Sequence, residues 1–298
     1  MEGRRFKKRN YAWEIPKKAK RHHATLPTLL RSFRQRRLPA QGAVRQKALL
    51  EADRKLAEHY RKYLSPECRH LVISQNLLPH LWQMGVLGGR TFDVLMERWP
   101  LEELQRRLNK AAARHPGSPT LGDFRADPVL VRMEREALAR AGKLVTPHRA
   151  IAMHFGHRAW LLDWKMPEVE ARSGEGGDHF FLPCSPLGRK GIYDLEGLGK
   201  KLVVLGRARE GGGEESFQQG ELKDLKTAKA VVLPAWVEHQ PRLALRSLAM
   251  GIPVFATEEC GLPDHPLVRV LPRDEFGSLD EAQKKQELSP TRIAVGQS

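Results

Sequence analysis

Two arginines stand at the start of a predicted helix, where positive charge is normally disfavoured. Pro241 suits the first helical position, and Arg242 and Arg246 follow it, four residues apart on the same face. The first-turn amides of a helix have no internal partners and attract anions, whereas the helix dipole opposes a cation there. A bound anion would offset that cost, so the spacing predicts an anion-binding site. The alternative is that both arginines are solvated or paired with Glu258 or Glu259.

The elements around these arginines form a unit that commonly binds ligands. Residues 230–234 are a short, uninterrupted apolar run, which is typical of a strand buried on both faces of a parallel sheet. A loop carrying Glu238 follows, the helix ends before Gly251 and Pro253, and residues 254–256 predict the next strand. Such units place ligands where the carboxyl end of a strand meets the amino end of a helix.

Length and composition describe a globular protein of two domains. The chain has 298 residues, of which 41% are hydrophobic and 29% charged, and chains of this size usually divide into two domains. No apolar run approaches the roughly 20 residues that span a bilayer, and the N-terminus lacks the apolar segment of a signal peptide. These features predict a cytoplasmic protein. Its three cysteines are widely spaced and odd in number, so they predict neither a disulfide framework nor a metal site.

Positive charge is concentrated at the N-terminus. Residues 1–40 contain thirteen Lys and Arg against two Glu, which gives this basic arm +11 of the net charge of +16. The arm could contact nucleic acid, the anionic inner face of a membrane or an acidic partner, and it could equally be a solubilising tail. Its few aromatic residues form no stacking platform for bases, which argues against nucleic acid. Composition alone does not choose among the others.

Alternating strands and helices along the rest of the chain predict an α/β protein with two Rossmann-like domains built on parallel sheets. The clearest single element is a helix over residues 128–140, because Asp127 is a good helix cap and Pro128 a good first helical residue. The predicted parts are a basic arm at 1–40, a first domain at 41–166, a polar glycine-rich linker at 167–178, a second domain at 179–286 and a frayed tail at 287–298.

The second half of the chain resembles the retaining glycosyltransferases of family 4, also called glycosyl transferases group 1. The resemblance is strongest from residue 179 to about residue 271. Glu238 matches the first of two glutamates in the family motif, and residues 248–256, LAMGIPVFA, match the tail that follows it. The resemblance implies the GT-B fold, in which two Rossmann-like domains face a cleft, here with a shortened and partly helical N-terminal domain.

The second glutamate of the family motif is missing. Arg246 stands eight positions after Glu238, where the family has an acid that binds the ribose hydroxyls of a nucleotide sugar. An arginine cannot accept hydrogen bonds from a diol, but its guanidinium can hold an additional phosphate through two parallel N–H groups.

The turn Arg189-Lys190-Gly191 resembles the family turn whose two bases hold the donor diphosphate. Lys190 and Gly191 match that turn, Ser185 stands at the position of its arginine, and Arg189 supplies a second charge. Two cations suit this role because a departing nucleoside diphosphate accumulates negative charge as the sugar–oxygen bond breaks.

In the first half the resemblance is looser, and analogy with the fold implies that loops after strands bind the acceptor. The acceptor-side candidates are Asn76, His80, Arg90, Asp123 and Arg125. His148 follows a predicted strand just before a helix, and we interpret it as the catalytic contact to the transferred sugar. A capping or surface role is its alternative.

The resemblance implies a hexosyltransferase-type enzyme that moves a sugar from a nucleotide-sugar donor to an acceptor such as a cell-surface polysaccharide or a lipid carrier. Glu238 would hold hydroxyls of the donor sugar, while Arg189, Lys190, Arg242 and the amides near Pro241 would hold the diphosphate. No cofactor or metal is expected, since the sequence contains no Asp-x-Asp motif.

Two other classes of protein stay open at this point. A non-catalytic protein that binds sugars or nucleotides would keep the fold and lose the second acid, so Arg246 favours it. A nucleic-acid-associated protein is favoured by the basic arm and by the sequence pI near 10.0.

Overall fold

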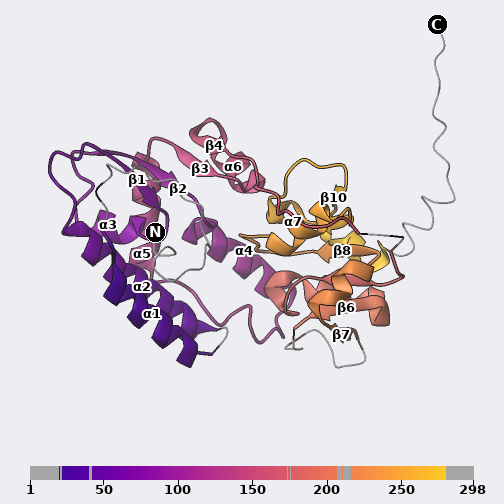
Figure 1. Ribbon diagram of the computed structural model, residues 1–298. Helices are drawn as coiled ribbons and strands as arrows, with labels where there is room; N and C mark the ends of the chain where they lie inside the picture. The colour runs from indigo at the N-terminus through magenta and orange to yellow at the C-terminus, as the bar shows by residue number, and fades with distance from the viewer. Residues whose placement is uncertain are drawn as a thin grey trace, which may run out of the picture. The chain divides into compact units, whose positions relative to one another are not determined.

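The computed structural model describes residues 20, 22–39, 42–172, 174, 176–206, 210 and 216–279. Contacts divide the chain into two compact units, each with its own sheet (Figure 1). Unit 1 comprises Met1–Glu102, Asp123–Val145 and His157–Trp160, and unit 2 comprises Glu103–Gly122, Thr146–Gly156 and Leu161–Ser298.

The sheet of unit 1 has the strand order β1-β2-β3-β4. Its strands are β1 (His70–Ser74), β2 (Thr91–Leu95), β3 (Leu144–Thr146) and β4 (Ala159–Leu161), the last residues of β3 and β4 belonging to unit 2. β1 pairs with β2, and β2 with β3, in parallel. Phe92 and Val94 of β2 are buried and alternate with less buried neighbours, which is the pattern of a strand covered mainly on one face.

The helices of unit 1 pack on one another. They are α1 (Thr25–Arg37), α2 (Ala43–Arg61), α3 (Leu78–Gln83) and α5 (Pro128–Arg140). α1 contacts α2, α2 contacts α3, and α3 contacts α5. The α5 prediction is confirmed at both ends, and the Asp127 carboxylate accepts a hydrogen bond from the Val129 amide at 2.7 Å, as a helix cap does. α1 lies inside the segment predicted as a basic arm, so part of that segment is a helix packed on its neighbour.

The sheet of unit 2 has the order β10-β9-β8-β5-β6-β7, and all its pairings are parallel. Its strands are β5 (Phe180–Leu182), β6 (Leu202–Leu205), β7 (Gln218–Gly220), β8 (Ala230–Leu233), β9 (Val254–Ala256) and β10 (Val268–Val270). Every residue of β8 is buried, which confirms the strand predicted from its apolar run. β5 and β9 are equally buried, so the central strands form the core of this unit.

The strand order of unit 2 reverses between β5 and β8. From β5 the chain adds β6 and β7 on one side of the sheet and later adds β8, β9 and β10 on the other. In open parallel sheets such a reversal leaves a crevice at the carboxyl ends of the two neighbouring strands, where ligands bind. The segments that follow β5 and β8 are therefore the first place to look for a site.

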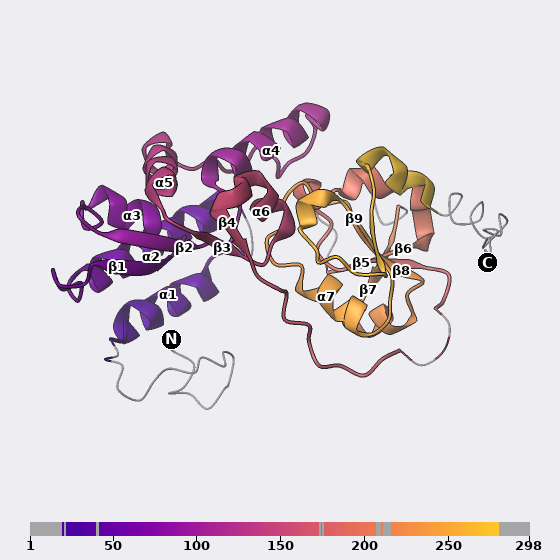
Figure 2. The same cartoon turned by 90° about the horizontal axis from the view of Figure 1, so that it is seen from above.

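The helical elements of unit 2 include both α-helices and 3-10 segments. They include α4 (Leu101–Arg114), whose first two residues belong to unit 1, α6 (Arg149–Phe155) and α7 (Arg242–Ala249), which contacts β9 (Figure 2). Within the described residues the 3-10 segments are η1 (Gly156–Arg158), η2 (Gly188–Lys190), η3 (Ile192–Lys201), η4 (Leu222–Thr227), η5 (Glu258–Cys260) and η6 (Arg273–Ser278).

The predicted fold class is confirmed: the chain is an α/β protein with two units that have parallel strands, and the first unit is strongly helical. A cleft between the two units stays a prediction, as do the domain bounds 41–166 and 179–286. The predicted linker at 167–178 lies within unit 2, and the predicted tail at 287–298 lies outside the described residues. Among the described helices, none has both the length and the apolar character needed to cross a membrane.

Candidate functional site

Two motifs singled out in the sequence follow the two strands at which the sheet order reverses. The turn Arg189-Lys190-Gly191 comes after β5, and the loop carrying Glu238 comes after β8. β5 and β8 are hydrogen-bonded neighbours in parallel register, with Phe181 opposite Val231. Both motifs therefore leave the sheet at its carboxyl edge, side by side.

The turn after β5 packs directly on the loop after β8. The amides of Trp236 and Val237 both donate to the carbonyl oxygen of Arg189, at 3.0 and 3.3 Å. Gly191 has a φ of 77°, and a Cβ at this position would overlap the carbonyl oxygen of Pro234. Only glycine permits this close approach of the two backbones, so the glycine of the motif has a definite structural task.

Lys190 and Glu238, 48 residues apart, form an ion pair at the centre of this contact. Lys190 Nζ lies 2.6 Å from Glu238 Oε2, and the two side chains are 15% and 13% exposed. The ammonium also donates to the Val237 carbonyl at 3.4 Å. The second carboxylate oxygen, Oε1, accepts from the amides of His239 and Gln240 at 2.8 and 3.1 Å. The pair is thus fixed at both ends.

These contacts decide the charge of Glu238. Burial alone would raise the pKa of its carboxyl, but the charge and hydrogen bond of Lys190 and the two backbone amides outweigh burial and hold the pKa below its usual value. Glu238 is consequently ionised at neutral pH. It cannot act as an acid in this state, but it can accept hydrogen bonds from hydroxyl groups.

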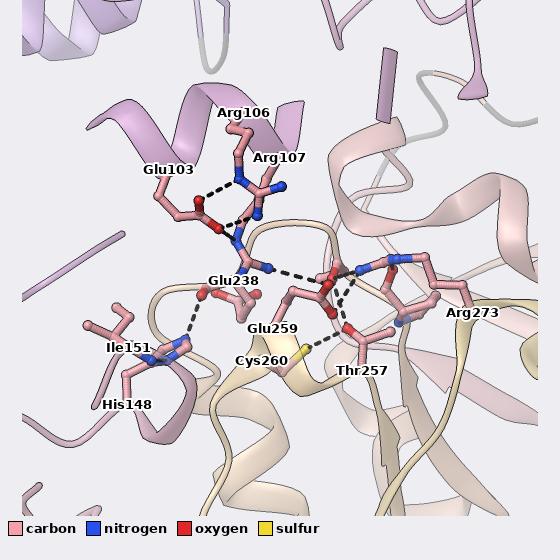
Figure 3. A network of polar contacts seen from close by, with 12 residues as sticks. Glu103, Arg106, Arg107, His148, Ile151, Glu238, Thr257, Glu259, Cys260 and Arg273 are labelled. Atoms are coloured by element: carbon pink, nitrogen blue, oxygen red, sulfur yellow. Dashed lines mark hydrogen bonds and ion pairs between the residues drawn. The ribbon is translucent and has the colours of Figure 1, made fainter. Parts of the chain in front are cut away.

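His148 supports the backbone at Glu238. Its Nδ1 accepts from the Ile151 amide at 3.3 Å and so caps α6, which leaves Nε2 to carry the ring proton and donate to the Glu238 carbonyl at 2.9 Å (Figure 3). The side chain is 2% exposed, and burial lowers its pKa to about 4. His148 is therefore a neutral positioning residue in the structure. Its direct contact with a transferred sugar stays a prediction.

A chain of charged side chains braces the same loop from the other side (Figure 3). Arg107 of α4 pairs with Glu259 at 3.3 Å, and Glu259 pairs with Arg273 at 2.9 Å. Arg273 donates to the carbonyls of Pro234 and Ala235 at 2.6 and 2.9 Å, and its guanidinium stacks on the Trp236 ring. These braces were not predicted, because nothing in the sequence marks three residues so far apart as partners.

The two arginines of α7 are not held by this network. Glu259, one of their expected alternative partners, is taken up by Arg107 and Arg273. Arg242 is exposed and donates to the Gln240 side chain at 2.6 Å, while the buried Nε of Arg246 lacks a hydrogen-bond partner. Across the described part of the chain neither arginine is paired with a carboxylate.

Pro241 departs slightly from its predicted place. The helix begins at Arg242, so Pro241 is the residue before the helix rather than its first residue. The reason is local: ψ at Pro241 is 51°, outside the helical range. The first turn of the helix still follows this residue directly.

The acceptor-side candidates are dispersed over unit 1. His80 and Arg125 line one cavity of about 610 Å³ between α2, α3 and the start of α5, whereas Asn76, Arg90 and Asp123 do not line it. Arg90 donates to three backbone carbonyls, those of Cys68, Val86 and Ser65, which ties down the ends of its loop. The side-chain amide of Asn76 donates to the Glu97 carboxylate at 2.8 Å, and Arg125 donates to the Phe124 carbonyl at 2.6 Å.

His80 has an unusual setting in that cavity wall. It is 4% exposed, both ring nitrogens are buried without a hydrogen-bond partner, and burial lowers the pKa of the ring. Burial likewise lowers the pKa of Arg125. An acceptor-binding role for the five candidates stays a prediction. Within the described residues, no three His, Cys, Asp or Glu side chains are grouped so that they could hold a metal ion.

Comparison with known proteins finds no matching family model and no matching curated protein. The chain is similar in structure to a sucrose-phosphate synthase from Thermosynechococcus elongatus, with 14% identity and a TM-score of 0.48 over 81% of this chain and 70% of that chain. It is also similar to an alpha,alpha-trehalose-phosphate synthase (UDP-forming) from Burkholderia xenovorans, solved with glucose-6-phosphate, with 9% identity and a TM-score of 0.44 over 87% and 74% of the two chains. A third similar structure is the glycotransferase of kitacinnamycin, with 12% identity and a TM-score of 0.36 over 84% of this chain and 79% of that chain.

These likenesses concern the fold alone. Membership of glycosyltransferase family 4 stays a prediction, and the residues at the carboxyl edge of the unit 2 sheet carry the functional inference.

Proposed function

We propose that this protein is a glycosyltransferase that binds the diphosphate of a nucleotide-sugar donor in unit 2. One observation carries the proposal. Lys190 and Glu238 belong to two motifs that were recognised separately in the sequence, and they meet at 2.6 Å where the strand order reverses. That is the position at which open parallel sheets bind nucleotides.

Lys190 retains one donor for a phosphate. An ammonium group has three N–H donors, and in the described chain Glu238 and the Val237 carbonyl occupy two of them. Arg189 lies next to it in the turn, and Arg242 begins the helix that follows Glu238. Together with the first amides of α7 these cations would stabilise the charge that develops on the leaving diphosphate, in place of a metal ion.

Glu238 would bind hydroxyl groups of the transferred sugar. Its carboxylate offers about four acceptor positions, and Lys190 and the amides of His239 and Gln240 take three. His148 fixes the backbone at this residue, so the remaining acceptor has a defined direction. The acceptor of the sugar would be a cell-surface polysaccharide, a lipid carrier or a similar molecule at the cytoplasmic face of a membrane.

Arg246 changes what the donor must offer. A glutamate at this position would bind the ribose diol, and an arginine cannot. The buried Nε of Arg246 has no hydrogen-bond partner in the described chain, which suits a further anionic oxygen of the donor.

A second candidate function is a non-catalytic protein that binds nucleotide sugars. The observation in its favour is that three acceptor positions of the Glu238 carboxylate are occupied before any ligand arrives. Such a protein would bind donors and turn over none of them.

The test is a thermal-shift screen with nucleoside diphosphates and their sugars, followed by transfer and donor-hydrolysis assays with the donors that bind. A ligand that prefers the native state raises the melting temperature with the logarithm of its concentration. We expect stabilisation by at least one diphosphate and turnover of its sugar, and we expect Glu238→Gln to remove most turnover while the protein stays folded. Glu196→Gln, which changes an exposed acid elsewhere in unit 2, is the control.

The outcomes separate the two candidates. Binding without turnover of any donor supports the non-catalytic protein. Stabilisation by none of the diphosphates, or full turnover by Glu238→Gln, contradicts the proposed site.

A further inference from the structure

An exposed apolar stripe runs along α1. Leu26, Leu29, Leu30 and Phe33 are spaced three and four residues apart, so they share one face of the helix. Each of them is at least half exposed, Leu26 at 68%. No residue of α1 is buried, although the helix contacts α2 along its length (Figures 1 and 2). A stripe of this kind normally faces a core, and among the described residues its four members stay at least half exposed.

Arginines border the stripe on both sides. At roughly 3.6 residues per turn, Arg34 and Arg36 fall on opposite flanks of the apolar face. Arg37 lies on the face itself, with its guanidinium 4.2 Å from the centre of the Phe33 ring. The helix contains no acidic residue, so the exposed face is apolar along its middle and cationic along its edges and its last turn.

The opposite side of the helix holds it in place on unit 1. Arg31 reaches from that side to Asp53 of α2 at 2.8 Å, and Asp53 is buried. The groove between the two helices is lined by Leu26, Leu30 and Arg34 among others, and it does not include Leu29 or Phe33. Leu29 and Phe33 therefore lie outside the groove, and the apolar stripe extends from the groove edge, at Leu26 and Leu30, to the outer face of the helix.

We propose that the outer face of α1 binds the surface of an anionic membrane. A helix with an apolar face and a basic polar face lies in the plane of the lipid headgroups, burying the apolar side chains among the acyl chains while the arginines contact anionic headgroups. Arginine suits this place because its long aliphatic stem stays in apolar surroundings while the guanidinium reaches the headgroups. The proposal does not depend on the enzymatic activity of unit 2.

Charge selects the membrane over the other occupants. A second copy of the chain would place two arginine-bordered stripes face to face, where like charges repel. A nucleic acid would engage the arginines but leave the three leucines without partners, and α1 offers Phe33 as its one aromatic side chain for stacking. An anionic bilayer satisfies both the apolar stripe and its charged borders.

The experiment is co-sedimentation of the full chain with vesicles of phosphatidylcholine alone and of phosphatidylcholine with an equal part of phosphatidylglycerol. We expect binding to the mixed vesicles that weakens as salt is raised, and little binding to phosphatidylcholine alone. The variant Leu29→Ser/Phe33→Ser should bind roughly a hundredfold more weakly, about tenfold for each buried side chain lost. Arg34→Gln/Arg36→Gln should lose roughly fivefold for each charge removed.

Matched controls lie on other exposed surfaces. Val129→Ser removes a 42% exposed apolar side chain from α5, and Arg140→Gln removes an exposed charge from the last turn of the same helix. Both should bind the mixed vesicles like the unchanged protein. Circular dichroism of each variant confirms that the helices are retained, which is expected because all the altered side chains are exposed or partly exposed.

Three results would overturn the proposal. The first is no binding to the mixed vesicles, and the second is unchanged binding by Leu29→Ser/Phe33→Ser. The third is tight binding to a single-stranded RNA that competes with the vesicles and survives the loss of Leu29 and Phe33, because it would assign the basic face to nucleic acid.

Discussion

Replacing Lys190 by Met tests whether the ion pair with Glu238 exists in the folded protein. Met keeps a long unbranched side chain and removes the charge. The Glu238 carboxylate, 13% exposed, then keeps its two amide hydrogen bonds but has no counter-charge. Removing one partner of a buried pair costs roughly 3–5 kcal/mol, and because two bonds remain we expect a loss of about 2–3 kcal/mol in the free energy of unfolding at neutral pH.

The sign of the pH dependence follows from the pKa of Glu238. In the unchanged protein burial is outweighed mainly by Lys190, and the carboxyl pKa lies below 4.5. The stability from the pair is then present above pH 4.5 and is lost as the pH falls through the lowered pKa. In the variant burial is opposed by the two amides alone, so the pKa rises and the penalty disappears once the carboxyl is protonated. The two proteins should differ most at neutral pH and least below pH 4.5.

Urea unfolding, followed by circular dichroism at both pH values, measures this difference. Glu238→Gln completes a double-mutant cycle, and Lys190→Met/Glu238→Gln should recover most of the loss because the neutral amide oxygen still accepts from the two backbone amides. A loss smaller than about 0.5 kcal/mol for Lys190→Met at neutral pH would refute the reasoning, because changes of that size are typical of surface positions.

Three further predictions concern the same site. Gly191→Ala and Gly251→Ala both place a side chain at a φ of 77°, but only the side chain at position 191 meets the Pro234 carbonyl. Urea unfolding should show a loss of about 1 kcal/mol in the free energy of unfolding for Gly251→Ala. The loss for Gly191→Ala should be larger by at least about 2 kcal/mol. His148, with its pKa lowered to about 4, should contribute about 3 kcal/mol of stability that is complete above pH 6.5 and lost between pH 6.5 and 4, and His148→Asn should flatten that part of the stability profile. Equal profiles for the two proteins would contradict the buried neutral ring. Arg246→Gln should weaken nucleoside diphosphate binding roughly tenfold in calorimetric titrations, and unchanged affinity would remove this residue from the donor site.

Much of the fold was predictable because its elements are encoded locally. α5 was predicted with its bounds because Asp127 and Pro128 mark its start by their own backbone preferences. β8 was predictable because an apolar run without charge has few other uses in a protein of this composition. The glycine of the Arg189-Lys190-Gly191 turn was also found from the sequence, although its contact with Pro234 was not.

Contacts between distant segments were not predictable in the same way. The sequence placed Lys190 and Glu238 in two separate motifs, and only the neighbouring positions of β5 and β8 bring them together. The His148 ring caps α6 and donates to the Glu238 carbonyl, and the second contact depends on how distant segments pack. The position of His148 in the sequence therefore does not separate a capping role from a catalytic one. The composition of Thr25–Arg37 does not predict its helix, because a segment rich in arginine is equally typical of a solvated tail.

The most direct test of the central claim is calorimetric titration of the full chain with the nucleoside diphosphate that gives the largest thermal shift. The measurement compares the unchanged protein with Lys190→Met and with Lys200→Met, which removes an exposed charge from η3 in the same unit. We predict that Lys190→Met binds at least tenfold more weakly, since a hydrogen bond to a charged group contributes roughly 1.5–3 kcal/mol, while Lys200→Met binds normally. Equal affinity of all three proteins for the diphosphate would contradict a donor site built on Lys190 and Glu238.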